Sequence, residues 1–158
     1  MSETNRVPCL ACEKGSMRAV FEPYPVVVAE GVSVLSAPVR FMKCDSCGDV
    51  IMHGDEAARA DVSAGKNLLR EVVQQQRTLN GRGVAFLRAM ISMTAKELSL
   101  RLRLDATTVS QWEGRNTTLP QPTAFAVAVF TLRELAKNKD EFLKEIEELV
   151  MKAFSKVA

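Results

Sequence analysis

Hydrophobic and polar positions divide the chain into a β-rich first third and a helical remainder. Residues of high β-propensity gather in four short runs, at 17–21, 26–29, 32–35 and 39–42. Residues typical of turns punctuate these runs at Pro23, Pro25, Gly31 and Pro38. From residue 55 onward, apolar residues recur at helical spacing instead. The pattern predicts an α+β protein in which a small antiparallel sheet precedes a set of helices.

Residues 55–78 are predicted to form one helix, with an apolar stripe that only Gly65 interrupts. The stripe consists of Ala58, Val62, Leu69, Val72 and Val73. We interpret this helix as a connector, and residues 78–83, which contain two glycines, as a flexible hinge that ends it. Residues 84–91 are then the first helix of an all-α bundle, with inward positions at Phe86, Leu87, Met90 and Ile91.

The stretch 94–113 predicts two short helices joined by a tight turn. Thr94 and Glu97 have the spacing of a capping box, so the first helix should begin at about residue 95. Leu98 and Leu102 lie on its buried side, and Ser99 is small enough to let a second helix cross closely.

The second helix of this pair carries a polar face suited to DNA. It is expected to run from an N-cap at Asp105 to about Glu113, with Val109 and Trp112 in the core. The opposite face carries Thr107, Thr108 and Gln111. Hydroxyl and amide groups on an exposed helix can read base edges in a major groove, and Gln pairs with adenine in a bidentate way. We interpret this helix as a DNA-recognition helix; a purely structural helix pair is the alternative on pattern alone.

Basic and polar residues flank the predicted recognition helix and are candidate phosphate contacts. They are Arg101 and Arg103 in the turn, and Arg115, Asn116 and Thr117 in the loop that follows. Residues 83–137 carry seven basic and four acidic side chains, whereas residues 1–54 carry five and six. The basic excess therefore lies in the segment for which DNA binding is predicted.

Two further helices are predicted after this loop. Thr123 is expected to cap a helix over 124–137 that is apolar almost all round at its start, and such a helix needs cover on more than one side. A last helix over 140–157 has an apolar stripe of Phe142, Ile146, Leu149, Val150, Ala153, Phe154 and Val157. We favour a homodimer over burial within one chain. Two recognition helices about 34 Å apart would then read a palindromic operator in double-stranded DNA.

All four cysteines fall in the first 47 residues, as two Cys-x-x-Cys pairs. Cys9 and Cys12 form the first pair and Cys44 and Cys47 the second, each followed closely by a glycine. Two thiolates at this spacing can reach one tetrahedral ion, so we predict a structural zinc site with four cysteine ligands. A β-rich segment of this size has too small a core to fold alone, and the metal would stabilise it. Disulfides and a rubredoxin-like iron centre remain alternatives.

Little else in the sequence suggests chemistry. The chain has one histidine, His53, which we expect at the surface, and no convincing pair of nucleophile and base, so an enzyme is not expected. The polar residues 1–6 are followed by no apolar h-region, and the longest apolar run, 124–130, is too short to span a bilayer. We expect a cytoplasmic protein with no membrane partner.

Two motifs together resemble known antitoxins. Residues 94–97 and the stretch Val109-Ser-Gln-Trp-Glu113 are similar to the helix-turn-helix signature of the Cro/Xre repressors. With the double Cys-x-x-Cys region in front, residues 9–137 resemble the MqsA family of antitoxins, which have a YgiT-type zinc finger followed by such a domain. Ala95 and Arg103 depart from the pattern, which often has Gln and Gly there.

The resemblance implies more than the residues alone. It implies that Cys9, Cys12, Cys44 and Cys47 hold a structural zinc, that the N-terminal domain binds a ribonuclease toxin, and that the C-terminal domain dimerises and represses its own operon. Thr107 and Gln111 occupy the family's two base-reading positions, where the best-known member has Asn and Arg, so the operator cannot be carried over.

The sequence thus predicts three regions: a four-cysteine zinc-binding domain over 1–54, a helical connector and hinge over 55–82, and a DNA-binding and dimerisation domain over 83–158. We expect a sequence-specific repressor that is the antitoxin of a type II toxin–antitoxin module. A stand-alone Xre-type regulator without a toxin is the first alternative, and a rubredoxin-like redox or electron-transfer protein is the second.

Overall fold

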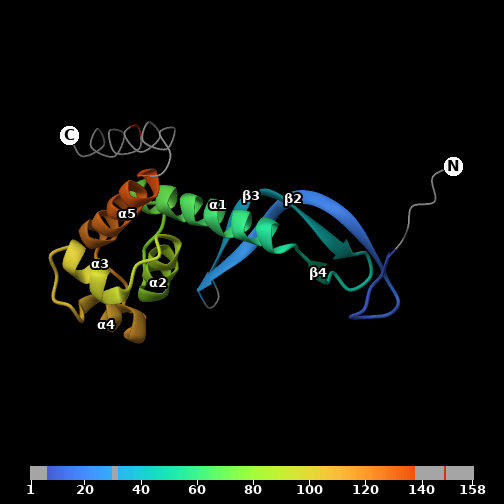
Figure 1. Ribbon diagram of the computed structural model, residues 1–158, viewed down its shortest axis with the longest axis horizontal. Helices are drawn as coiled ribbons and strands as arrows, with labels where there is room; N and C mark the ends of the chain where they lie inside the picture. The colour runs from blue at the N-terminus through green and yellow to red at the C-terminus, as the bar shows by residue number, and fades with distance from the viewer. Residues whose placement is uncertain (1–6, 30–31, 138–147, 149–158) are drawn as a thin grey trace. The chain divides into compact units, whose positions relative to one another are not determined.

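The computed structural model describes residues 7–29, 32–137 and 148 (Figure 1). Its elements are β1 (Val7–Pro8), β2 (Ser16–Ala29), β3 (Val32–Cys44), β4 (Val50–Ile51), α1 (Gly54–Val73), α2 (Gly81–Met90), α3 (Ala95–Arg101), α4 (Thr108–Arg115) and α5 (Gln121–Ala136). The chain divides into two compact units. The first contains residues 1–26 and 35–64, and the second contains residues 27–34 and 65–158. The described part confirms the α+β class, with four antiparallel strands followed by five helices.

The sheet has the strand order β1-β2-β3-β4 and is built mainly from two long strands. The four short β-runs expected from the sequence are wrong in extent, because they merge into β2 and β3. Pro23 and Pro25 do not interrupt β2, because of the way in which Tyr24, the residue between them, faces β3. Tyr24 donates its backbone N–H to Ser36 Oγ on β3 at 3.0 Å. Successive N–H groups of a strand point to opposite edges, so both proline nitrogens lie on the outer edge of β2.

The outer edge of β3 is satisfied by side chains of α1. Glu56 Oε2 accepts the backbone N–H of Arg40 at 3.2 Å. Ser63 Oγ, two helical turns further on, accepts the N–H of Ala37 at 3.0 Å. Exposed strand edges invite pairing with other chains. In the first unit, proline on one edge and helix side chains on the other reduce that exposure.

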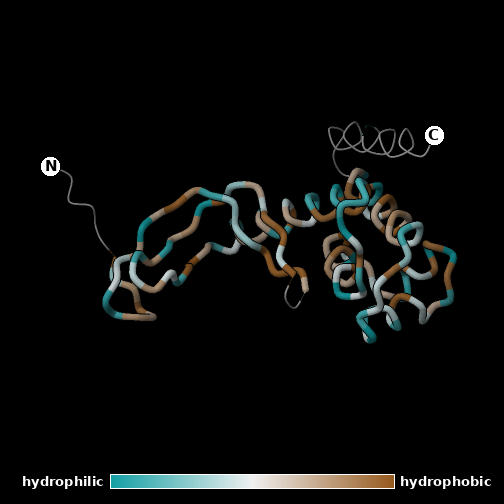
Figure 2. The backbone as a smooth tube through the Cα atoms, turned by 180° about the vertical axis from the view of Figure 1, so that it is seen from behind, coloured by the Kyte–Doolittle hydropathy of each residue, from teal (hydrophilic) through white to brown (hydrophobic). Residues whose placement is uncertain are grey.

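One face of the two long strands is buried. Val26, Val28, Val34, Val39 and Phe41 are each less than 9% exposed, whereas Val27 is 71% exposed. Figure 2 shows the hydrophobic stretches along these strands. Val26 and Val28 therefore belong to the buried face of the sheet.

Helix α1 buries Leu69, Val72 and Val73 as predicted, but the first part of the stripe differs. Ala58 is exposed and Val62 is 45% exposed, so these two assignments are wrong. The buried positions are Ala60, Ala64, Leu68, Leu69, Val72 and Val73. Gly65 is not a weak point of the stripe, because a Cβ there would lie 1.9 Å from Met90 Sδ. The glycine lets α2 approach α1 closely.

The predicted hinge at 78–83 contains buried residues and the start of α2. Leu79 is 1% exposed, and Gly81 begins α2 after an N-cap at Asn80, whose side chain accepts the N–H of Gly83 at 2.9 Å. The inward positions of α2 are Gly81, Gly83, Val84 and Leu87, whereas Phe86, Met90 and Ile91 are only partly buried. The glycines serve close packing here rather than flexibility.

Helices α3 to α5 follow the expected order with two corrected starts. The capping box at Thr94 and Glu97 is confirmed. Asp105 is not the N-cap of the next helix, because its carbonyl accepts the N–H of Thr108 in a preceding turn and α4 begins at Thr108. Thr123 is not a cap either, since α5 begins at Gln121 after Pro120. Of the predicted helix over 140–157, only Glu148 is among the described residues, and the stripe proposed for the dimer lies outside them.

Candidate metal centre and polar helix face

The two cysteine pairs adopt matching turns. In the first turn, the N–H of Glu13 donates to the carbonyl of Cys9 at 2.9 Å; in the second, the N–H of Gly48 donates to the carbonyl of Cys44 at 3.2 Å. The residue after each pair is left-handed, with φ 56° at Glu13 and 77° at Gly48. Glycine takes this conformation without strain and glutamate does not. Two unlike sequences therefore form the same knuckle.

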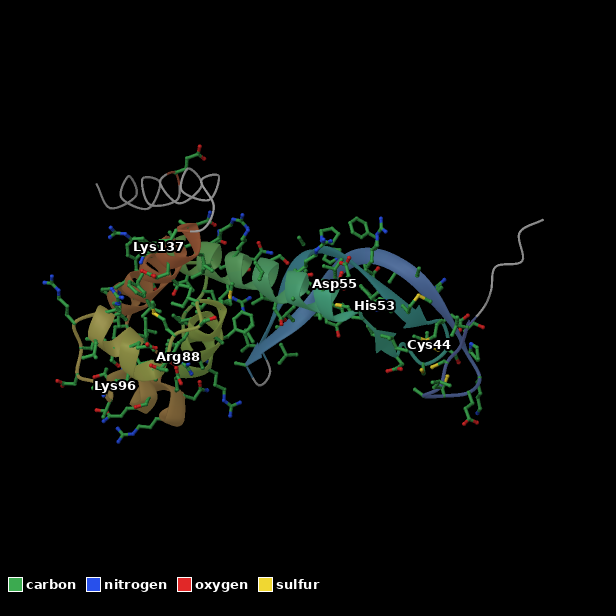
Figure 3. All side chains as sticks on the ribbon, viewed as in Figure 1. Cys44, His53, Asp55, Arg88, Lys96 and Lys137 are labelled. Atoms are coloured by element: carbon green, nitrogen blue, oxygen red, sulfur yellow. The ribbon has the colours of Figure 1, made fainter. Side chains whose placement is uncertain are left out.

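The four thiols gather at one point, on the turns at the end of the sheet (Figure 3). Their sulfur atoms all lie within 4.8 Å of one another, and the Cys9–Cys47 and Cys12–Cys44 pairs are each 3.7 Å apart. A tetrahedral ion with metal–sulfur bonds of about 2.3 Å separates its ligands by about 3.8 Å, so the spacing fits. Disulfide-bonded sulfurs would be about 2.05 Å apart, and all four cysteines are free. The cluster can bind a metal ion; zinc and iron share this geometry.

Neighbouring residues hold the knuckles together. Cys9, Met17 and Cys44 form a small buried cluster, with Cys12 and Met42 packed against it. Ser16 links the two turns, because its N–H donates to Asp45 Oδ1 at 2.9 Å and its carbonyl accepts the N–H of Asp45 at 3.1 Å.

Gly15 belongs to the same packing arrangement. A Cβ on Gly15 would lie 2.4 Å from Cys44 Sγ. The sequence suggested this glycine for a sharp turn, but the structure requires it because there is no space for a side chain.

The thiols differ in acidity when no ion is bound. Backbone N–H groups of Lys14 and Gly15 lower the pKa of Cys12 to about 7. The N–H of Cys47 likewise lowers the pKa of Cys44. The N–H of Asp49 favours the Cys47 thiolate, but desolvation and the three neighbouring sulfurs outweigh it and raise the pKa of Cys47 to about 12. Binding a cation to all four thiolates must therefore release protons near neutral pH.

The second unit contains the polar helix face predicted from the sequence. On α4 and the residue before it, Thr107 and Gln111 are exposed, Thr108 is half-buried and Val109 is fully buried. Trp112 is only partly buried, although a core position was expected. The candidate phosphate contacts are all exposed: Arg101, Arg103, Arg115, Asn116 and Thr117.

Two interactions fix the position of α4. Ser99 is fully buried, and its hydroxyl accepts the N–H of Val109 at 3.0 Å, so the small residue provides both the close crossing and a hydrogen bond. Arg88 of α2 reaches Glu113 with two hydrogen bonds of 2.7 and 3.1 Å. A third Arg88 donor contacts the carbonyl of Met93 at 2.7 Å. Figure 3 labels Arg88 among the helices of this unit. No sequence motif pointed to Arg88.

Two of the predicted DNA contacts also have structural roles. Arg103 is left-handed, with φ 58°, at the position where a glycine was expected in the turn. Asn116 ends α4 with φ 46°, and its Oδ1 accepts the N–H of Arg82 at 3.1 Å. The Asn116 carboxamide oxygen thus satisfies a backbone donor in the first turn of α2.

Exposed apolar side chains concentrate on the first unit, which the sequence pattern did not reveal. They are Val7, Leu10, Phe21, Leu35, Ile51 and Val62, with exposures from 45% to 85%. Leu10 lies inside the first knuckle, and Phe21 and Leu35 lie on the long strands. His53 is exposed, as expected, and is not part of the cysteine cluster.

Comparisons with known proteins assign no family to this chain. No protein-family model matches the sequence, and no curated protein is significantly similar to it. Among the described helices, none has the length and apolar character that crossing a membrane requires.

Proposed function

We propose that this protein is a sequence-specific DNA-binding repressor with a structural zinc ion, and that it acts as the antitoxin of a toxin–antitoxin module. In this proposal α3 and α4 form a helix-turn-helix, and α4 enters the major groove. The observation that carries the proposal is the two-sided character of α4. Val109 is buried against the hydroxyl of Ser99, while Thr107 and Gln111 project from the exposed side.

The surrounding charge supports the same interpretation. Arg101, Arg103 and Arg115 are exposed around α4, and the segment 83–137 has a net excess of three positive charges. Such side chains position a protein on the phosphate backbone, whereas Gln and Thr supply base contacts. Because the two base-reading side chains are Gln and Thr, adenine is the base we expect Gln111 to contact.

Binding to DNA tests the proposal directly. A cognate site is selected from a random library, and affinity is measured by fluorescence anisotropy on that site and on random DNA. Gln111→Ala should cost about 1–3 kcal/mol on the cognate site and little on random DNA. Arg103→Ala should weaken binding to the cognate site and to random DNA alike. It should also reduce the slope of log affinity against log salt concentration by about one. Gln74→Ala, which removes an exposed glutamine at the end of α1, is the matched control. Equal losses on both DNAs for Gln111→Ala would reject base reading.

The antitoxin part of the proposal is supported by the exposed apolar side chains of the first unit. Large apolar side chains of this kind supply the core of many protein–protein interfaces. The chain would be co-expressed with its native operon neighbours and analysed by intact-complex mass spectrometry. Leu35→Asp should abolish binding of a stoichiometric small partner. Leu100→Asp is the matched control, because Leu100 is 56% exposed and Leu35 59%, and it should leave that binding intact. No partner for the unaltered chain would favour a stand-alone regulator.

The cysteine cluster also permits a redox function, because iron fits the same four sulfurs. Visible absorbance of the purified protein distinguishes the two cases. An iron tetrathiolate site is coloured and changes reversibly on reduction, whereas a zinc site is colourless. A coloured, reducible protein would favour the rubredoxin-like alternative for the first unit.

A further inference from the structure

The first turn of α2 packs directly against the backbone of α4. Gly81 is buried, and a Cβ built on it would lie 1.8 Å from the carbonyl oxygen of Trp112 and 2.9 Å from the nitrogen of Glu113. Real Cβ atoms do not approach other heavy atoms so closely, and here the neighbour is backbone rather than a flexible side chain. Only glycine at position 81 therefore allows α2 and α4 their present separation.

Hydrogen bonds hold the two segments at the same place. The N–H of Arg82, next to Gly81, donates to Asn116 Oδ1 at 3.1 Å. The carbonyl of Trp112, which faces Gly81, accepts the N–H of Thr117 at 3.0 Å. A backbone bridge between Asn80 and Thr118 continues the contact. The Asn116 side chain and the Asn80–Thr118 bridge thus link the loop at the end of α4 to the start of α2.

We infer that Gly81 is a positioning residue that sets the depth and register of α4, and therefore the placement of Gln111. The inference rests on the proposed DNA-binding function for its consequence, but not for its geometry. Any side chain at position 81 must push α4 outward by the thickness of a methyl group. Such a displacement changes where Gln111 meets a base edge, since bidentate pairing depends on position and angle.

The experiment compares two glycine-to-alanine variants of the full chain. Gly114 lies on α4 itself and is exposed, and a Cβ there meets nothing within 4 Å. Gly114→Ala is therefore the matched control, because it adds the same methyl group without touching α2. Trp112 is the only tryptophan of the chain and lies beside Gly81, so its fluorescence reports the packing without any DNA.

We expect Gly81→Ala to shift the emission of Trp112 and increase its quenching by iodide, while Gly114→Ala leaves both unchanged. We also expect Gly81→Ala to lower the ratio of cognate to random DNA affinity by about fivefold to a hundredfold, the value of one bidentate base contact. Affinity for random DNA should change less, because two of the three candidate phosphate-contacting arginines, Arg101 and Arg103, lie outside α4.

The outcomes separate this inference from the proposed function. An unchanged Trp112 signal in folded Gly81→Ala overturns the inference. A shifted signal with an unchanged affinity ratio overturns the role in specificity. If the unaltered chain prefers no DNA sequence, the proposed function fails while the Trp112 signal still tests the packing. Should Gly81→Ala not fold, Asn116→Ala removes the bond to Arg82 and is read by Trp112 fluorescence alone, because Asn116 is itself a candidate phosphate contact. We expect its Trp112 emission to shift in the same direction by less, and no shift overturns the inference.

Discussion

The metal-binding end of the first unit and the helical second unit are stabilised by different interactions. At the knuckles, the buried cluster consists of sulfur-containing residues, Cys9, Met17 and Cys44. The second unit instead buries many aliphatic side chains almost completely, including Leu68, Leu69, Leu79, Leu87, Leu98, Val84, Val109 and Val127. Apolar burial contributes about 25 cal/mol per Å², so the helices can be stable without a ligand. In the proposed function, an ion held by the four thiolates would supply this stabilisation at the knuckles.

The same two units also differ in what they expose. The first unit has six large apolar side chains that are exposed, and the second has two, Val27 and Leu100, among the described residues. The exposed groups around α4 are mainly polar or basic. In the proposed function, the first unit would offer exposed apolar side chains to a protein partner, and the second unit a polar, positive surface to nucleic acid.

Removing the metal should produce the largest effect and should affect one unit only. A structural zinc site contributes on the order of 10 kcal/mol, so chelation or Cys44→Ser should unfold the knuckle end. Tyr24 and Trp112 are the only tyrosine and tryptophan, and they lie in different units. Near-ultraviolet circular dichroism and NMR of these two residues follow each unit separately. We expect the Tyr24 environment to be lost and that of Trp112 to remain.

Ser46→Ala is the control for metal removal, because it changes the residue beside Cys47 without removing a thiolate. It should retain stoichiometric metal. Loss of the Trp112 signal together with that of Tyr24 would show that the helical unit depends on the metal too, and the contrast between the units would then be wrong.

Breaking the ion pair of the second unit should have an intermediate effect. Arg88 and Glu113 have side chains 24% and 18% exposed and are joined by two hydrogen bonds. Glu113→Gln should lower the free energy of unfolding by about 1–3 kcal/mol, because Arg88 keeps its charge without a full partner. Glu134→Gln removes the partner of Lys137, which is 56% exposed, and should cost less than about 0.5 kcal/mol. Equal losses in urea titrations would contradict a special role for the Arg88 pair.

The capping box of α3 should give the smallest effect, with a characteristic pH dependence. Thr94→Ala should cost about 1 kcal/mol. Hydrogen bonds from the Thr94 backbone and hydroxyl lower the pKa of Glu97 in the folded protein. The Glu97 carboxylate therefore contributes fully to the free energy of unfolding above its pKa in the unfolded chain, about 4.3. This contribution is lost as the pH falls through its lower pKa in the folded protein. The stability difference between Glu97→Gln and the unaltered chain should vanish in that acid range, and a constant difference from pH 7 to pH 2 would contradict this account.

Features that depend on neighbouring residues in the chain were predictable. The capping box needs only Thr94 and Glu97, three residues apart, and the structure confirms it. Each Cys-x-x-Cys pair places two thiols on one turn, and the gathering of both pairs was expected because neither can satisfy a tetrahedral ion alone. The polar outer face of α4 followed from helical periodicity.

Features that depend on residues far apart in the chain were not predictable from the sequence. Pro23 and Pro25 suggested turns, and only the pairing of Tyr24 with Ser36 revealed that they occupy a strand edge. Gly65 interrupted the predicted apolar stripe and Gly81 lay in the predicted hinge, yet each lies against another helix. The Arg88–Glu113 pair spans 25 residues and has no local signature. Sequence by itself determined the capping box at Thr94, the polar outer face of α4 and the two cysteine pairs, because these depend on residues close together in the chain. Only the tertiary structure decided which edge, which close contact and which charge pair each residue serves, because these depend on atoms brought together by folding.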